Sequence, residues 1–109
     1  MLERDYLMRT IAKLTAALAR IAGLARAGKR DEAELELDET YREILGVSRA
    51  DAMRLAPSSL GMVLGRERAE LAARLCDAEA DALETARDAA KAHLRRARAE
   101  AIRKALAGA

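Results

Sequence analysis

The amino-acid sequence predicts an all-α protein, and three observations indicate this fold class. Alanine, the residue with the highest helix propensity, supplies 27 of the 109 residues, and there is one proline. Apolar residues recur at spacings of three and four, the period of an amphipathic helix. The residues that favour strands are sparse, and Tyr6 and Tyr41 are the only aromatic side chains. A chain of this length is too short for two independent cores, so we expect a single helical domain over residues 1–109.

The first hairpin is expected over residues 1–46. One helix should run from about Glu3 to Ala27, and a second from about Asp31 to Leu45, before Gly46. Gly28 suits a left-handed C-cap between them. The apolar seam of the first helix consists of Leu7, Ile11, Leu14, Leu18, Ile21 and Ala25, and that of the second of Ala33, Leu37, Tyr41, Ile44 and Leu45. These two seams should pack against each other.

Two short helices should connect the hairpins over residues 47–65. Ser48, with Asp51 three residues later, resembles a capping box and predicts a helix to about Leu55. Pro57 ends that helix and suits the first turn of another, which should stop before Gly65.

Residues 66–109 form either a second hairpin or one long helix, because neither glycine nor proline occurs between Arg66 and Gly108. We favour two helices, since Thr85 and Asp88 have the spacing of an N-terminal cap. The seam before this point is Leu71, Leu75, Ala78 and Ala82, and the seam after it is Ala90, Leu94, Ala97, Ala101 and Ala105. Ile102 and Leu106 lie to one side of the second seam and are candidates for another contact surface. One continuous helix would predict an elongated dimer.

Charge is unevenly distributed along the chain. The segment from Asp31 to Glu43 has seven acidic residues against one basic residue, and the segment from Arg87 to the end has seven basic residues against two acidic ones. These segments could face each other, or both could be solvated faces with weak ion pairs. A basic last helix that binds nucleic acid is a less favoured alternative.

Two acidic stripes are the best candidates for catalysis. Glu32, Glu36, Glu39 and Glu43 share one helix face, and Asp77, Asp81, Glu84 and Asp88 repeat that spacing. The pairs Glu36-x-x-Glu39 and Glu67-x-x-Glu70 are similar to those with which all-helical nucleoside triphosphate pyrophosphohydrolases hold Mg²⁺, although no Glu-x-x-Asp pair follows. A metal-dependent nucleotide phosphohydrolase is therefore one alternative. We favour a solvated acidic face, and we expect no catalytic, cofactor or metal site.

The remaining reactive side chains have simple interpretations. Cys76 lacks a second cysteine for a disulfide and suits a small buried thiol in an alanine-rich stretch. His93 stands among basic residues and is expected at the surface.

The turn Gly28-Lys29-Arg30-Asp31-Glu32-Ala33 resembles the turn inside tetratricopeptide-type hairpins. Residues 4–11, 18–24, 38–41 and 44–46 are similar to a family of small bacterial helical proteins of unknown function. The resemblance covers the first 46 residues. It implies tetratricopeptide-like helical hairpins and brings no known activity.

These observations favour a protein interaction module with a groove for a peptide or helix. Candidate partner-binding residues are Arg4, Tyr6, Arg9 and Tyr41. The expected partner is another protein or, through self-association, a second copy in a homodimer. Charged residues near the start replace the apolar run of a signal peptide, and no stretch approaches the length of a membrane span, so we expect no membrane contact and a cytoplasmic location.

Overall fold

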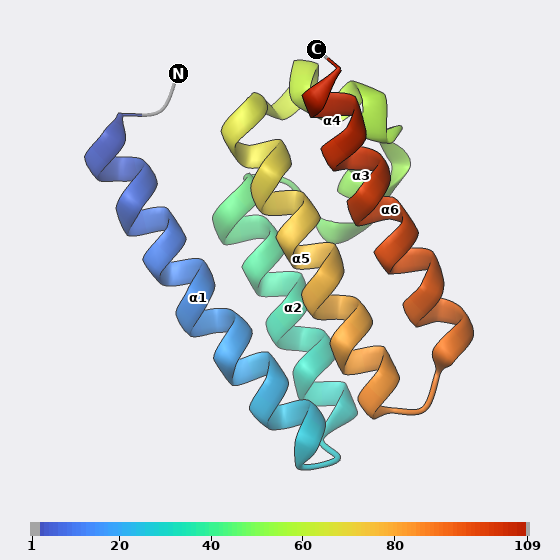
Figure 1. Cartoon of the computed structure of the whole chain (residues 1–109). Helices are drawn as coiled ribbons and strands as arrows, with labels where there is room; N and C mark the ends of the chain where they lie inside the picture. Colours follow the sequence, from blue (N-terminus) through green and yellow to red (C-terminus); the bar gives the residue numbers. More distant parts are fainter. Residues whose placement is uncertain (1–2, 109) are drawn as a thin grey trace.

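The computed structural model describes residues 3–108, and these residues form helices and no strand. The helices are α1 (Arg4–Arg26), α2 (Arg30–Leu45), α3 (Arg49–Arg54), α4 (Pro57–Leu64), α5 (Arg66–Thr85) and α6 (Ala89–Ala107) (Figure 1). The predicted all-α class is confirmed, as are two long hairpins joined by short helices. None of the helices described has both the length and the apolar character needed to cross a membrane.

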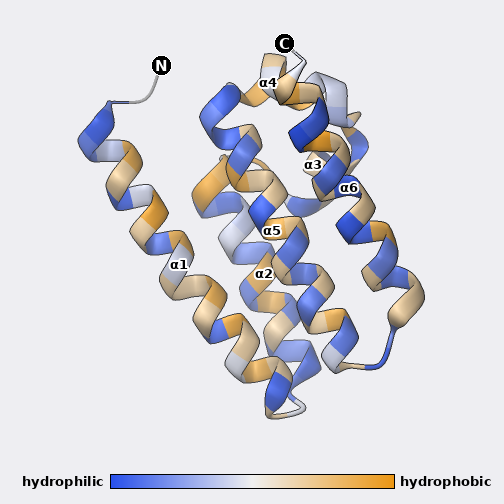
Figure 2. Cartoon of the chain, viewed as in Figure 1, coloured by the Kyte–Doolittle hydropathy of each residue, from blue (hydrophilic) through white to orange (hydrophobic). Residues whose placement is uncertain are grey.

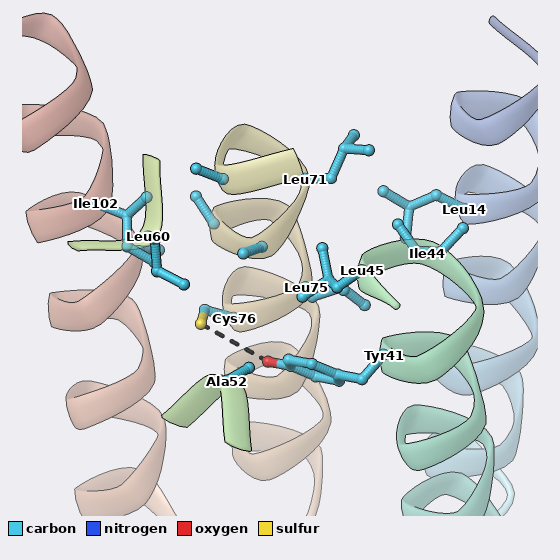
Figure 3. Close-up of a cluster of buried hydrophobic side chains, with 14 of the residues drawn as sticks. Leu14, Tyr41, Ile44, Leu45, Ala52, Leu60, Leu71, Leu75, Cys76 and Ile102 are labelled. Atoms are coloured by element: carbon cyan, nitrogen blue, oxygen red, sulfur yellow. Dashed lines mark hydrogen bonds between the residues drawn. The ribbon is translucent and has the colours of Figure 1, made fainter. Parts of the chain in front are cut away.

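Helix α5 lies at the centre of the fold. It contacts α1, α2, α4 and α6, whereas α1 and α2 form one antiparallel hairpin and α5 and α6 form the other (Figure 1). Helices α1 and α5 run in the same direction. The largest fully buried side chains come from α1, α2, α4, α5 and α6. These side chains are Leu14, Ile21, Leu37, Tyr41, Leu45, Leu60, Leu75, Cys76 and Ile102. Those that Figure 3 labels point toward a common interior. One core therefore holds both hairpins together.

The turn between α1 and α2 is closed by Gly28, as predicted. Gly28 has a φ of 76°, and its N–H donates to the carbonyl of Ala25 over 3.1 Å. The N–H of Lys29 donates to the carbonyl of Leu24 over 2.9 Å. These two bonds make a Schellman motif, which satisfies the carbonyls at the end of α1.

The turn between α5 and α6 contains no glycine. Arg87 is the only non-glycine residue of 3–108 with a positive φ, and Asp88 is the N-cap of α6, accepting from the N–H of Lys91 over 3.3 Å. Thr85 is the last residue of α5, and its hydroxyl donates to the carbonyl of Asp81. The prediction of two helices is confirmed, but Thr85 is not the cap, because its side chain bonds backwards into its own helix.

The predicted seam of α6 is wrong. Its buried residues are Ala92, Ala99, Ile102 and Leu106. Leu94, which was assigned to the seam, is 60% exposed. Ile102 and Leu106 belong to the core, since burying larger apolar side chains stabilises a fold more than burying alanine. Helix α4 also approaches α6 closely there, because a Cβ on Gly61 would lie 3.2 Å from Cδ2 of Leu106.

The two segments of opposite charge share one hollow, which Glu34 and Asp38 line together with Lys91 and Arg95, but no ion pair among residues 3–108 joins them. Helix α5 separates α2 from most of α6 (Figure 1). Acidic residues of α2 pair with α1, as Glu36 does with Arg20 over 2.8 Å. Basic residues of α6 pair with α5, as Arg103 does with Asp77 over 2.7 Å. Helix α6 is therefore balanced mainly by its hairpin partner α5, whereas the acidic residues of α2 pair with α1 and with Arg49 of α3.

Candidate binding groove

A groove of about 520 Å³ lies between α1 and α5. Its α1 side is apolar and consists of Leu18, Ile21, Ala22 and Ala25, followed by Arg26 at the helix end. Its α5 side carries the charged residues Arg74, Asp77 and Asp81, with Ala78, Ala82 and Thr85 between and beyond them. Arg103 of α6 completes the lining. The groove thus has one apolar side and one charged side.

The apolar side of the groove belongs to a second stripe on α1. The first stripe is fully buried and consists of Thr10, Leu14, Ala17 and Ile21. The second stripe is only half-buried, runs beside the first, and consists of Leu7, Ile11, Leu18, Ala22 and Ala25. Its spacings are close to multiples of a helical turn, so its members share one face. Figure 2 shows apolar positions recurring along α1 in this way. Helix α1 therefore keeps apolar surface beyond what the core covers.

The acidic residues of the groove are already paired. Asp77 lies 2.7 Å from Nη2 of Arg103, and Asp81 lies 2.7 Å from Nη2 of Arg96. By contrast, no carboxylate among residues 3–108 lies within 4.0 Å of the guanidinium of Arg26 or Arg74. The charge left uncompensated along the groove is therefore positive.

A buried carboxylate stabilises another side of α5. Glu79 is 4% exposed, and its Oε1 accepts a hydrogen bond of 2.9 Å from the hydroxyl of Tyr41. Its Oε2 accepts from Nε of Arg95 over 3.0 Å and lies 3.6 Å from Nη1 of Arg49. A buried carboxylate is tolerated only with such partners, because burial removes its hydration. Glu79 thus connects α2, α3, α5 and α6.

Two arginine side chains, Arg49 and Arg98, make further contacts between α3 and its neighbours. Arg49 also lies 2.6 Å from Glu34 and 2.8 Å from Asp38. Burial lowers the pKa of Arg49, but its bond to Glu34 and the surrounding carboxylates outweigh that effect and raise the pKa above its usual value. Nη2 of Arg98 donates to the carbonyls of Ala52 and Leu55, both over 2.8 Å. These contacts hold α3 against α2 and α6.

Cys76 lies beside this network and is buried, as predicted. Its Sγ is 3.8 Å from the Tyr41 hydroxyl oxygen (Figure 3). Burial, together with the charge of Glu79, raises the pKa of the Cys76 thiol despite its hydrogen bond with Tyr41. The thiol therefore stays protonated and does not favour nucleophilic chemistry.

The four predicted partner-binding residues fall into two groups. Arg4, Tyr6 and Arg9 are exposed on the first turns of α1, where Tyr6 is 45% exposed. Tyr41 is 1% exposed, so its assignment to a binding surface is wrong. Its place in the apolar seam of α2 already indicated a core residue. His93 is exposed, as expected.

The acidic stripes are occupied by ion pairs. Glu36 pairs with Arg20, Glu43 with Lys13, and Glu84 with Arg96. Within residues 3–108 there is no group of three or more His, Cys, Asp and Glu side chains placed to hold a metal ion. These three stripe carboxylates are therefore engaged by basic side chains.

Sequence reasoning missed two features of the site. The free arginines Arg26 and Arg74 could not be told from the paired ones, because spacing does not reveal partners across helices. Glu79 did carry a signal, since it occupies a position between Cys76 and Leu83 on an otherwise apolar face of α5.

No family model, curated protein or solved structure matches the chain. Its resemblance to a bacterial helical family stays a prediction.

Proposed function

We propose that the protein is a protein interaction module, and that the groove between α1 and α5 binds a helical segment of a partner. The observation that carries this proposal is the half-buried second stripe of α1. It continues past the groove lining toward the N-terminus, through Ile11 to Leu7. A partner would complete the burial that the core leaves unfinished.

An amphipathic helix suits such a surface. Its apolar side chains recur every three or four residues, which matches the spacing along the second stripe of α1. The exposed first turns of α1 extend the surface with Arg4, Tyr6 and Arg9. Tyrosine and arginine contribute strongly to binding when they become buried at an interface. The proposed location of this interaction is the cytoplasm.

The ion pairs favour this proposal over the two alternatives. Arg95, Arg96 and Arg103 of α6 contact carboxylates of α5, and Arg98 contacts backbone carbonyls. These contacts reduce the positive charge that α6 could present to phosphates. Of the carboxylates suggested for a phosphohydrolase, Glu36 pairs with Arg20 and Glu70 with Arg66.

The experiment is a selection of helical peptides from a display library against the purified protein. Selected peptides are then titrated against the native protein, Leu18→Glu and Ala16→Glu. Leu18 lines the groove, whereas Ala16 is exposed on another face of α1. Circular dichroism establishes that both variants keep their helical content.

We expect the selected peptides to bind the native protein and Ala16→Glu equally. They should bind Leu18→Glu at least about tenfold more weakly, because the substitution replaces an apolar side chain that the peptide would cover with a charged one. Peptides that bind Leu18→Glu as tightly as the native protein would contradict the proposal. A selection that yields no binder would contradict it as well.

A further inference from the structure

We infer that the groove between α1 and α5 selects an acidic amphipathic helix, one whose apolar stripe is flanked by aspartate or glutamate. This inference rests on the proposed function and specifies the chemistry of the partner. The two cations on which it depends are Arg26, at the end of α1, and Arg74, on the charged side formed by α5.

The groove presents these two cations while its anions already have arginine partners on α6. Asp77 and Asp81 are engaged by Arg103 and Arg96 of α6. Arg26 and Arg74 are the groove-lining cations that have no carboxylate of residues 3–108 within 4.0 Å. A ligand can therefore pair with both arginines without first breaking an internal ion pair.

The positive character continues beyond the groove. Arg74 and Arg103 also line the adjacent hollow between α5 and α6, together with Arg66 and Glu70. Nη1 of Arg66 donates to the carbonyl of Leu106, and its Nε lies 3.7 Å from Glu70. A segment that follows α5 from Arg26 toward this hollow would meet an excess of guanidinium groups.

The apolar side decides the form of the partner. Leu18, Ala22 and Ala25 border the cations, so the occupant must bring apolar and acidic side chains on adjacent faces. A guanidinium binds a carboxylate through two parallel hydrogen bonds, and partial exclusion of water by neighbouring apolar groups strengthens that contact. Lysine at the same flanking positions would be repelled.

The test uses three synthetic helical peptides of about 20 residues, enough for about five helical turns. They share one leucine stripe and differ only in whether glutamate, glutamine or lysine flanks it. Each peptide is titrated by fluorescence anisotropy against the native protein, the double variant Arg26→Gln/Arg74→Gln, and the control Arg42→Gln/Arg54→Gln. The control removes the same charge from exposed arginines that do not line the groove. Circular dichroism verifies that both variants remain folded.

We expect the glutamate peptide to bind the native protein about tenfold more tightly than the glutamine peptide, and the lysine peptide to bind most weakly. Added salt should reduce the difference. The Arg26→Gln/Arg74→Gln variant should bind the glutamate and glutamine peptides equally, whereas the control should keep the order of the native protein.

The outcomes separate this inference from the proposed function. If all three peptides bind the native protein equally and Leu18→Glu binds none of them, the acidic preference is overturned and the groove remains a binding site. Absence of binding by every peptide would overturn both. Sedimentation equilibrium is measured in parallel, and a dimer that Leu18→Glu dissociates would show that a second copy, and not an acidic partner, occupies the groove.

Discussion

Arg87 occupies in the second hairpin the position that Gly28 occupies in the first. Their φ angles are 63° and 76°. In each turn the N–H of this residue bonds to the carbonyl three residues earlier, that of Glu84 for Arg87 and that of Ala25 for Gly28. Arg87 is a non-glycine L-residue in a left-handed conformation, which its Cβ disfavours by roughly 1–2 kcal/mol.

Replacing Arg87 with glycine should stabilise the protein. The substitution relieves the strain at the turn, and we expect the free energy of unfolding in urea to rise by about 1 kcal/mol. The reciprocal control, Gly28→Arg, should lower it by a similar amount. A loss of stability in Arg87→Gly would show that the arginine side chain contributes more than its backbone strain costs.

The register of α6 can be tested with two truncations. Ile102 is fully buried, so Ile102→Ala should lower the free energy of unfolding by about 2–5 kcal/mol. Leu94 is mostly exposed, so Leu94→Ala should change it by less than about 0.5 kcal/mol. Thermal and urea denaturation give both values. A larger loss in Leu94→Ala would show that Leu94 is buried, as the seam predicted from the sequence requires.

The hydrogen bond from Tyr41 to Glu79 should contribute measurably to stability. Tyr41→Phe keeps the ring in the core but removes one of the donors to a buried carboxylate. We expect a loss of about 1–3 kcal/mol in urea denaturation. Tyr6→Phe, at an exposed position, is the matched control and should have no effect. Equal stability of the two variants would mean that Arg95 and Arg49 compensate Glu79 fully.

Stability should decrease in alkaline solution because of the same tyrosine. Burial, followed by the charge of Glu79, raises the pKa of Tyr41 well above its usual value of 10.0. Above about pH 10 the unfolded chain therefore releases a proton that the folded protein keeps, so stability is full below that pH and falls above it. Between about pH 9 and pH 11 the native protein should lose about 1 kcal/mol more than Tyr41→Phe. Parallel pH profiles of the two proteins would contradict the raised pKa.

The sequence by itself determined the local structure of most of the chain. Gly28 and Gly46 end α1 and α2, Ser48 caps α3 by accepting from the N–H of Asp51, and Pro57 begins α4. These signals act over one helical turn, so they can be read from neighbouring residues. The apolar face of α2 could be recognised for the same reason, because its residues differ strongly from the charged ones on the other faces.

The tertiary structure decided which faces are buried and which charges are free. On α6 the alanine stripe and the face of Ile102 both have helical spacing, and packing against α4 and α5 selects the second because it buries larger side chains. Tyr41 became a donor to Glu79, and Arg26 and Arg74 became the free cations of the groove, through contacts between residues far apart in sequence. Helical periodicity specifies which residues share a face, but only the packing of helices determines what each face meets.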